Sequence, residues 1–399
     1  MSESKRKIGL ATAVIIGINA MIGAGIFALP AVLATNVGPA GILAFIFVVF
    51  SVWFIAQSLA HVAKKFPQEG SFYLYVKQWA GHTMGIITSG SYIVGLLIGM
   101  GLLTQVAGNF ATTFFPNMSA KLLGVTILTS LVIINLMGIY MSQLGQKILI
   151  FCTVIPILAI IIMSLTNADP ILLTPFAPYG FVNVLKATKI VIFGFFGFEC
   201  ATSLFNIVKN PERNVPKALT YSILFVGTLY TLFISAIIVS TPLELFATNS
   251  LAEVLKIMFP NHSWIITIIN ISMLSAILGT IHSMLWASSN LMTSLFKNMK
   301  NKYIQNLLAK NILNKKSAII ITGVGILTTF LTIQKQDLFF SFAAIFVVFT
   351  YIMSIITLLF SKEDWKSGQN IKTILGLVTA SMIFIFALQG LIIELQKIL

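Results

Sequence analysis

The sequence predicts an all-α polytopic membrane protein that crosses the bilayer about eleven times. Its 399 residues are 57% hydrophobic and 9% charged, whereas a water-soluble globular domain carries about 25% charged residues. A membrane-spanning helix needs about 20 mainly apolar residues. Segments of that kind lie at 8–34, 39–61, 82–114, 121–141, 147–166, 187–207, 217–240, 263–296, 317–334, 338–360 and 373–396.

The basic residues indicate how the chain is oriented. If the N-terminus is cytoplasmic, most of the 25 lysines and arginines fall on cytoplasmic loops. The six on the opposite side are Lys121, Lys186, Lys189, Lys256, Lys335 and Lys397. Membrane topology follows this bias, so the net charge of +14 indicates orientation and not a nucleic-acid partner. We therefore expect a multi-pass protein of a bacterial cytoplasmic (inner) membrane, in contact with the lipid bilayer.

The chain is predicted to form one membrane domain over residues 1–399. No polar stretch is long enough to fold as a soluble domain, and the basic start at 1–7 leads into apolar sequence that continues beyond the length of a signal peptide. Cys152 and Cys200 both fall inside predicted spans, which favours small core residues over a disulfide or metal pair. We expect no metal and no cofactor, and a homodimer remains open.

Two predicted spans are interrupted by glycine. Gly23-Ala24-Gly25 lies within the first, and Gly194 and Gly197 lie within the sixth. Each glycine inside a helix costs about 1 kcal/mol relative to alanine. Unwound backbone at membrane depth is tolerated only where protein or a water-filled cavity satisfies its polar groups.

The spacing of these interruptions favours a broken-helix interpretation over simple packing. Glycine pairs in membrane helices often just allow close helix contact. Here, however, the interrupted spans are five apart, which is typical of inverted five-helix repeats with a binding site between them. The expected repeats cover about 8–166 and 187–360, and an extra helix follows at about 373–396.

Glu199 is the one acidic residue of eleven that lies deep inside a predicted span. A membrane-embedded carboxyl costs about 2.5–3.5 kcal/mol on insertion scales, and such a residue is commonly functional. Because burial favours the neutral form of a carboxyl, Glu199 is a candidate for gating or for carrying a proton. The alternative is a neutral carboxyl that only bonds the loosened backbone of its own helix.

Several other polar or aromatic residues lie at membrane depth. His282, beside Thr280 and Ser283, is a candidate for a proton or substrate role, although a hydrogen-bonded core histidine is the more common case. Asn19 and Asn290 are more typical of contacts between helices than of ligand binding. Weaker candidates for lining a cavity are Tyr92, Ser283 and Tyr351.

Four motifs resemble those of the amino acid–polyamine–organocation superfamily of permeases. Residues 21–30 (MIGAGIFALP) are similar to its first-helix signature, and residues 195–199 (FFGFE) to its sixth-helix signature. Residues 209–218 (KNPERNVPKA) resemble the cytoplasmic loop that follows, and residues 66–76 (FPQEGSFYLYV) match an earlier loop. Together the motifs extend over about 200 residues in the family's order.

The resemblance implies a leucine-transporter-type fold with a 5+5 inverted repeat, discontinuous helices 1 and 6, and 11–12 spans. It is strongest to bacterial antiporters of the arginine/agmatine type. By that resemblance the substrate carboxylate would bind amides at Ala24 and Gly25, and its ammonium would bind carbonyls of helices 1 and 6. The implied substrate-binding residues are Met21, Ile22, Gly23, Ala24, Gly25, Ile26, Phe193, Phe196 and Gly197, and Phe193 also occupies the place of a substrate-capping aromatic.

The predicted function is secondary transport of amino acids or related amines by alternating access, linked to protons or to exchange. No lysine lies within 148–166, where some family members place one, while Ser288 and Ser289 leave a sodium-coupled symporter of another solute as the alternative. A channel is less favoured because pore-lining charged rings are missing. An enzyme is not expected, because neither a zinc motif nor paired deep carboxylates occur.

Overall fold

The computed structural model describes residues 7–67, 71–205, 207–247, 249–262, 264–332, 335–360 and 369–397, and describes only the backbone at 189, 190, 193, 247, 336, 337 and 369. Within these residues the chain is almost entirely helical. The long helices are α3 (Gly41–Lys65), α4 (Ser71–Ala111), α5 (Ala120–Leu136), α6 (Ile139–Thr166), α8 (Pro211–Ser240), α10 (Trp264–Asn298), α12 (Lys315–Thr332), α13 (Gln336–Leu359) and α14 (Gln369–Gln396).

The two segments with internal glycines are divided into shorter elements. The first consists of α1 (Leu10–Met21) and α2 (Gly25–Asn36), and the second of α7 (Phe181–Val191) with the 3-10 turns η4 (Ile192–Phe195) and η5 (Phe198–Leu204). The remaining short elements are η2 (Gly38–Ala40), η3 (Pro170–Leu173), η6 (Leu243–Ala247), α9 (Leu251–Met258) and α11 (Lys302–Ala309).

Nine segments of the described chain are long and apolar enough to cross a membrane, if the bent pair α1–α2 counts as one. The other two segments predicted from the sequence are shorter. Helix α5 has 17 residues, and the segment 187–207 is split among α7, η4 and η5. The predicted third span starts where expected, after Gly81, whose φ of 80° interrupts α4.

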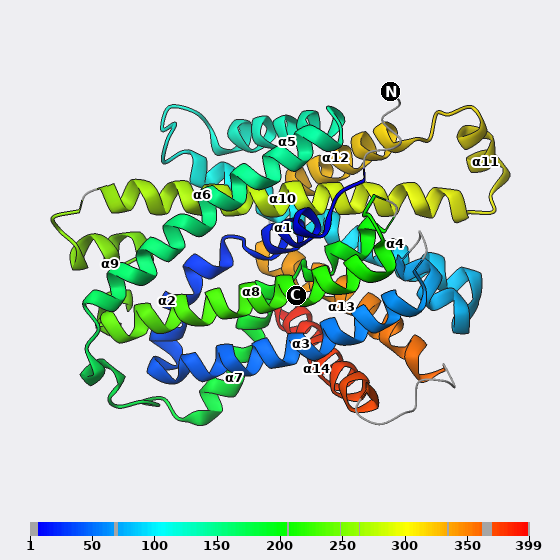
Figure 1. The fold of residues 1–399 in the computed structure, drawn as a ribbon. Helices are drawn as coiled ribbons and strands as arrows, with labels where there is room; N and C mark the ends of the chain where they lie inside the picture. Colours follow the sequence, from blue (N-terminus) through cyan, green and yellow to red (C-terminus); the bar gives the residue numbers. More distant parts are fainter. Residues whose placement is uncertain are drawn as a thin grey trace.

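Helix α10 crosses the bundle from end to end (Figure 1). Helices α4, α5, α6 and α12 pack against it, and so do α1 and η5 of the two broken segments. Helix α8 packs on α1, α3 on α8, and α14 on α3, so several layers separate the broken segments from the outside of the bundle. The interruptions in α1–α2 and in η4–η5 therefore lie near the centre of the molecule.

The two broken segments are joined at one end. The amide of Ile8 donates to the carbonyl of Ile207 at 2.7 Å, and the amide of Lys209 donates to the carbonyl of Ile8 at 2.9 Å. These two bonds form the isolated parallel bridge between Ile8 and Val208. The Ser71 hydroxyl at the start of α4 donates to the carbonyl of Thr202 in η5. The start of the first broken segment is thus fixed to the end of the second.

Candidate functional site

The break in the first segment falls where the sequence predicts it. Helix α1 ends at Met21, and Ile22 takes an extended conformation with φ −77° and ψ 93°. Helix α2 begins at Gly25 with its axis bent by 44°. Among the described residues, the amides of Gly23 and Ala24 donate no backbone hydrogen bond. The first amides of α2 also have no acceptor within the helix. Several N–H groups at this break are therefore available to bind a ligand.

The break in the second segment depends on Gly197. Its φ of 105° lies in the left-handed region, which favours glycine. A Cβ at this position would lie 2.4 Å from the carbonyl oxygen of Ala20 in α1. The missing side chain therefore allows the backbones of the two broken segments to touch.

The Glu199 side chain is fully buried at the start of η5 and both of its oxygens accept hydrogen bonds. The Tyr92 hydroxyl donates to Oε1 at 3.0 Å, and the Gly197 amide donates to Oε2 at 3.1 Å. The hydroxyl of Tyr351 also interacts with this carboxyl. Glu199 thus fixes the break and links it to α4.

Two hydroxyls hold the carbonyls that the break in α1 leaves without helical partners. The Tyr230 hydroxyl of α8 donates to the carbonyl of Met21 at 3.0 Å. Oγ1 of Thr280 in α10 lies 3.0 Å from the carbonyl oxygens of both Asn19 and Ile22. These contacts could not be predicted from the sequence, because a tyrosine and a threonine inside apolar helices carry no local signal of a partner far away in the chain.

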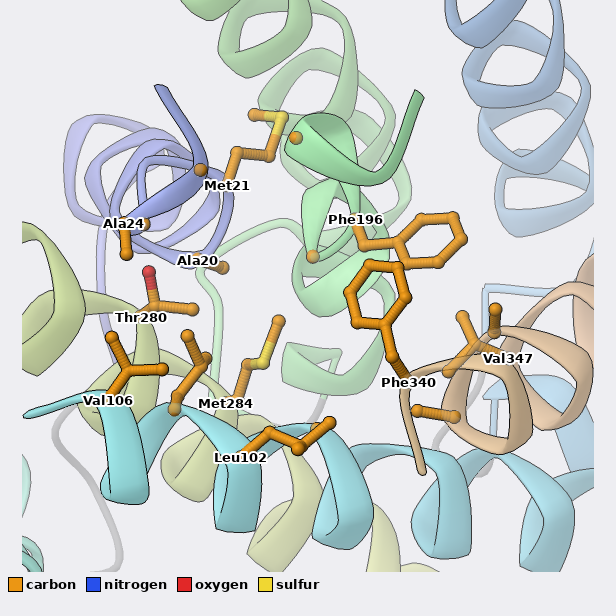
Figure 2. A pocket seen from close by; sticks show the side chains of 18 of the residues that line it. Ala20, Met21, Ala24, Leu102, Val106, Phe196, Thr280, Met284, Phe340 and Val347 are labelled. Atoms are coloured by element: carbon orange, nitrogen blue, oxygen red, sulfur yellow. The ribbon is translucent and has the colours of Figure 1, made fainter. Parts of the chain in front are cut away.

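A cavity of about 380 Å³ lies between the two breaks and helices α4 and α13. Figure 2 shows Met21 and Ala24 on one side of it, Leu102 and Val106 of α4 opposite, and Phe340 with Val347 of α13 toward one end. The volume is within the range of about 300–1,000 Å³ typical of ligand sites. The described residues that line it are Ala20, Met21, Gly23, Ala24, Gly25, Ala28, Leu29, Val32, Gly95, Leu96, Gly99, Leu102, Leu103, Val106, Gly194, Phe196, Gly197, Glu199, Tyr230, Thr280, Met284, Phe340, Ala343, Ala344 and Val347.

Half of the predicted site residues share this cavity. It brings together Met21, Gly23, Ala24, Gly25, Phe196, Gly197 and Glu199. Ile22 and Ile26 belong to the same break, but their side chains are buried and do not line the cavity. The side chain of Phe193 lies outside the described part of the structure. Tyr92, Ser283 and Tyr351, expected to line the cavity, are instead fully buried outside its lining, because each packs between helices.

His282 also lies outside the cavity lining, in a buried polar cluster. Nδ1 of its ring is 2.9 Å from Nδ2 of Asn135, and its Nε2 is 3.2 Å from the carbonyl oxygen of Ser142. Because the amide nitrogen is a donor, Nδ1 accepts and the Nε2–H donates. Both ring nitrogens are therefore bonded to protein, as in a structural core histidine.

Gln146 extends this cluster to the first broken segment. Its Oε1 accepts from Asn19 at 2.6 Å and from the hydroxyl of Ser283 at 2.9 Å. Asn19 thus makes a contact between helices, as its type and depth predict, whereas nothing in the sequence identifies Gln146 as the partner. The cluster therefore ties α6 to both α1 and α10.

The cysteines differ from each other in their surroundings. Cys200 is buried beside Glu199, as expected of a core residue, whereas Cys152 is exposed on α6 and is not a core residue. Among the described residues, no group of three or more His, Cys, Asp or Glu side chains could hold a metal ion. The hydroxyls of Ser288 and Ser289 donate to carbonyls of their own helix, at Leu285 and Trp286.

Comparison with solved structures identifies the fold. The crystal structure of MhsT in complex with L-phenylalanine matches with a TM-score of 0.67 and 13% identity, over 95% of this chain and 98% of that chain. The leucine-transporter-type fold predicted from the sequence is therefore confirmed.

Comparison with known sequences identifies the family. The branched-chain amino acid permease BcaP of Bacillus subtilis is 28% identical over 300 residues, which cover 69% of this chain and 63% of that protein. The methylthioribose transporter of the same organism is 26% identical over 240 residues, or 54% of this chain and 51% of that protein. The chain thus matches less than two thirds of the length of these relatives. The family model described as amino acid permease matches residues 8–394, and the chain belongs to that family.

Proposed function

We propose that this protein is a secondary transporter that moves an amino acid or a related amine across the cytoplasmic membrane by alternating access. The observation that carries the proposal is the central cavity, which is bounded by both helix breaks. Transporters of this architecture bind substrate near the bilayer midplane, where half-helix ends and unwound backbone supply polar groups. The two repeats, about 8–166 and 187–360, would then move around the bound substrate.

The break in α1 suits the carboxylate of an amino acid. The free amides at Ala24 and Gly25 lie at the N-terminus of α2, where the helix dipole favours negative charge. Among the described residues that line the cavity, none is a lysine or arginine. We therefore propose that backbone amides, and no cationic side chain, bind the carboxylate.

The substrate ammonium needs acceptors on the other side of the cavity. The carbonyl of Met21 already accepts from Tyr230, and that of Ile22 from Thr280, which leaves each of them one further lone pair. The unwound backbone around Phe193 and Phe196 supplies more carbonyls. We propose that the ammonium binds to these groups from helix 6 and to the Met21 carbonyl.

The names of several relatives, though not that of the methylthioribose transporter, agree with this substrate class. Besides BcaP, they include cationic amino acid transporter 9 of Arabidopsis thaliana, which is 23% identical over 248 residues, or 56% of this chain and 44% of that protein. We propose proton linkage or exchange as the driving reaction, because Glu199 lines the cavity and its carboxyl can take up and release a proton. The distribution of basic residues supports a cytoplasmic N-terminus.

Reconstitution of the full chain into proteoliposomes tests the function. We expect saturable and stereoselective counterflow of at least one radiolabelled amino acid or amine, accelerated by unlabelled substrate on the far side. A proton ionophore in parallel vesicles separates proton-driven uptake from exchange, and replacement of sodium by choline tests sodium dependence. Flux that does not saturate and has high conductance would contradict a transporter. A thermal-shift screen in which no amino acid or amine stabilises the protein would contradict the substrate class.

A further inference from the structure

One end of the cavity is lined only by apolar groups. It is formed by α4 and α13 together with Phe196, and Figure 2 shows Phe340 and Val347 at this end, away from Ala24 and Thr280. The described side chains there are Leu96, Leu102, Phe196, Phe340, Ala343, Ala344 and Val347. A substrate held by its carboxylate at the break in α1 would direct its side chain toward this apolar end.

Among the described lining residues, the polar side chains of Glu199, Tyr230 and Thr280 make hydrogen bonds within the protein. Both oxygens of Glu199 accept hydrogen bonds from Tyr92 and Gly197. The hydroxyl hydrogens of Tyr230 and Thr280 are directed to carbonyls of the first broken segment. At the apolar end, a polar substrate side chain would lose its hydration and meet no polar side chain among the described lining residues, which disfavours its binding.

Gly99 makes room at this end of the cavity. It lies on α4 between Leu96 and Leu102 and lines the cavity, and a Cβ added to it would meet no atom within 4 Å. Gly95, one turn earlier, is different, because a Cβ there would lie 2.8 Å from Cγ2 of Val347. Gly95 thus allows α4 to pack on α13, while Gly99 leaves open space that a ligand side chain can fill.

We infer that the substrate is an amino acid with a large apolar side chain, and that Gly99 determines how large that side chain can be. This inference rests on the proposed function and narrows its substrate class. Each additional buried methylene raises affinity about fourfold, so binding is expected to increase from alanine through valine to leucine. The preference comes from the apolar end of the cavity, while the backbone groups at the breaks bind the part that all amino acids share.

Pairs of amino acids of similar shape and different polarity test the apolar preference. The full chain in proteoliposomes is assayed for inhibition of labelled uptake by valine and threonine, leucine and asparagine, and norleucine and lysine. We expect the apolar member of each pair to bind at least tenfold more tightly. Equal affinity within the pairs, or preference for asparagine or lysine, would overturn the inference.

Substitution of Gly99 tests its assigned role. Gly99→Leu is expected to weaken leucine and phenylalanine binding more than tenfold and alanine binding less than threefold, and Gly99→Ala is expected to give an intermediate loss. Gly90 is the matched control, since its Cβ would also meet nothing within 4 Å, it lies on the same helix, and it does not line the cavity. Nine residues are two and a half helical turns, so Gly90 lies on the opposite face about 13.5 Å away.

The controls distinguish a failed inference from a failed function. Gly90→Leu and Gly90→Ala are expected to leave the affinity for every amino acid unchanged, and thermal unfolding shows whether each variant is folded. If Gly99→Leu does not fold, the leucine affinities of Gly99→Ala and Gly90→Ala are compared, and a loss in Gly99→Ala alone supports the role of Gly99. Binding of polar amino acids in preference to apolar ones overturns the inference but leaves amino acid transport in place. Binding of no amino acid by the folded wild-type protein overturns both.

Discussion

The hydroxyl of Tyr92 donates a 3.0 Å hydrogen bond to Oε1 of Glu199, and the amide of Gly197 donates to the other carboxyl oxygen at 3.1 Å. One side chain thus fixes the left-handed backbone at Gly197 and connects it to α4. The same carboxyl lines the cavity. From the sequence, gating or proton transfer and bonding of its own loosened helix are alternative roles for Glu199. This geometry makes the two roles compatible.

A double-mutant cycle measures the link between α4 and the break. Tyr92→Phe removes the hydroxyl that donates to Glu199. Glu199→Gln replaces the carboxyl that accepts from Tyr92 and from the Gly197 amide. We expect a coupling energy of about 0.5–3 kcal/mol in the free energy of unfolding, because contacting residues in one hydrogen-bond network have couplings of that size. Denaturant unfolding in detergent provides the values. Additive effects within about 0.3 kcal/mol would mean that the contact contributes nothing specific.

Transport by Glu199→Gln is expected to lose its dependence on pH. Glu199 is the one titratable acid among the described residues that line the cavity, and an amide cannot exchange a proton in its place. Initial uptake rates between about pH 5 and pH 8 in proteoliposomes measure the effect. Tyr92→Phe is the control, because it keeps the carboxyl and should keep the pH dependence. An unchanged pH profile in Glu199→Gln would leave Glu199 a structural role only.

The two breaks were predictable from the sequence because their cause is local. Gly23, Gly25 and Gly197 weaken a helix wherever they occur, and their spacing by five spans indicated a common site. The hydroxyls that complete the site could not be predicted in the same way. Tyr230 and Thr280 contact Met21 and Ile22 across more than 200 residues of sequence, and only the packing of α8 and α10 against α1 brings them there.

The positions of Tyr92, Ser283 and Tyr351 outside the cavity lining have a related cause. A polar group at membrane depth indicates that the side chain avoids lipid, but does not distinguish a cavity from a contact between helices. Tyr92 faces Glu199 and Ser283 faces Gln146, so both are satisfied by protein. A second sequence signal, such as helix periodicity, would not have separated the two cases, because both surfaces point away from lipid.

His282→Gln is expected to affect stability more than transport. The ring is bonded to Asn135 and Ser142, and it does not line the cavity. Loss of one of these buried hydrogen bonds costs about 1–3 kcal/mol. We expect a lower midpoint of thermal unfolding with substrate affinity within twofold of the wild type. A large loss of substrate affinity or of proton dependence with unchanged stability would instead assign His282 to transport.

Helix α9 is predicted to lose order in acid. The backbone amide and hydroxyl of Ser250 donate to Oε2 of Glu253 at 2.7 and 2.8 Å, and these bonds lower the pKa of Glu253 below its usual value of 4.5. A carboxyl whose pKa is lower in the folded state than in the unfolded state stabilises the helix at pH values above the unfolded-state pKa. This stabilisation is lost as the pH falls through the folded-state pKa. Hydrogen exchange of the α9 amides should therefore lose protection below about pH 4. Glu253→Gln should remove this pH dependence, because an amide at this position does not titrate, and if it does not, other groups are responsible.

Gly25 and Gly197 are predicted to respond to substitution in opposite ways. A Cβ at Gly25 would meet nothing within 4 Å, so Gly25→Ala and Gly25→Val should fold normally. Because Gly25 lines the cavity at the proposed carboxylate site, Gly25→Val should weaken substrate binding more than about tenfold, or about 1.4 kcal/mol.

At Gly197 even alanine should destabilise the protein by more than about 2 kcal/mol. It would be held at φ 105°, and its Cβ would lie 2.4 Å from the carbonyl oxygen of Ala20. Thermal unfolding of the purified variants measures their stability, and ligand-induced thermal shifts measure their substrate affinity. Retained affinity in folded Gly25→Val would place the substrate away from the break in α1, and a stable Gly197→Ala would mean that the two broken segments do not need this contact.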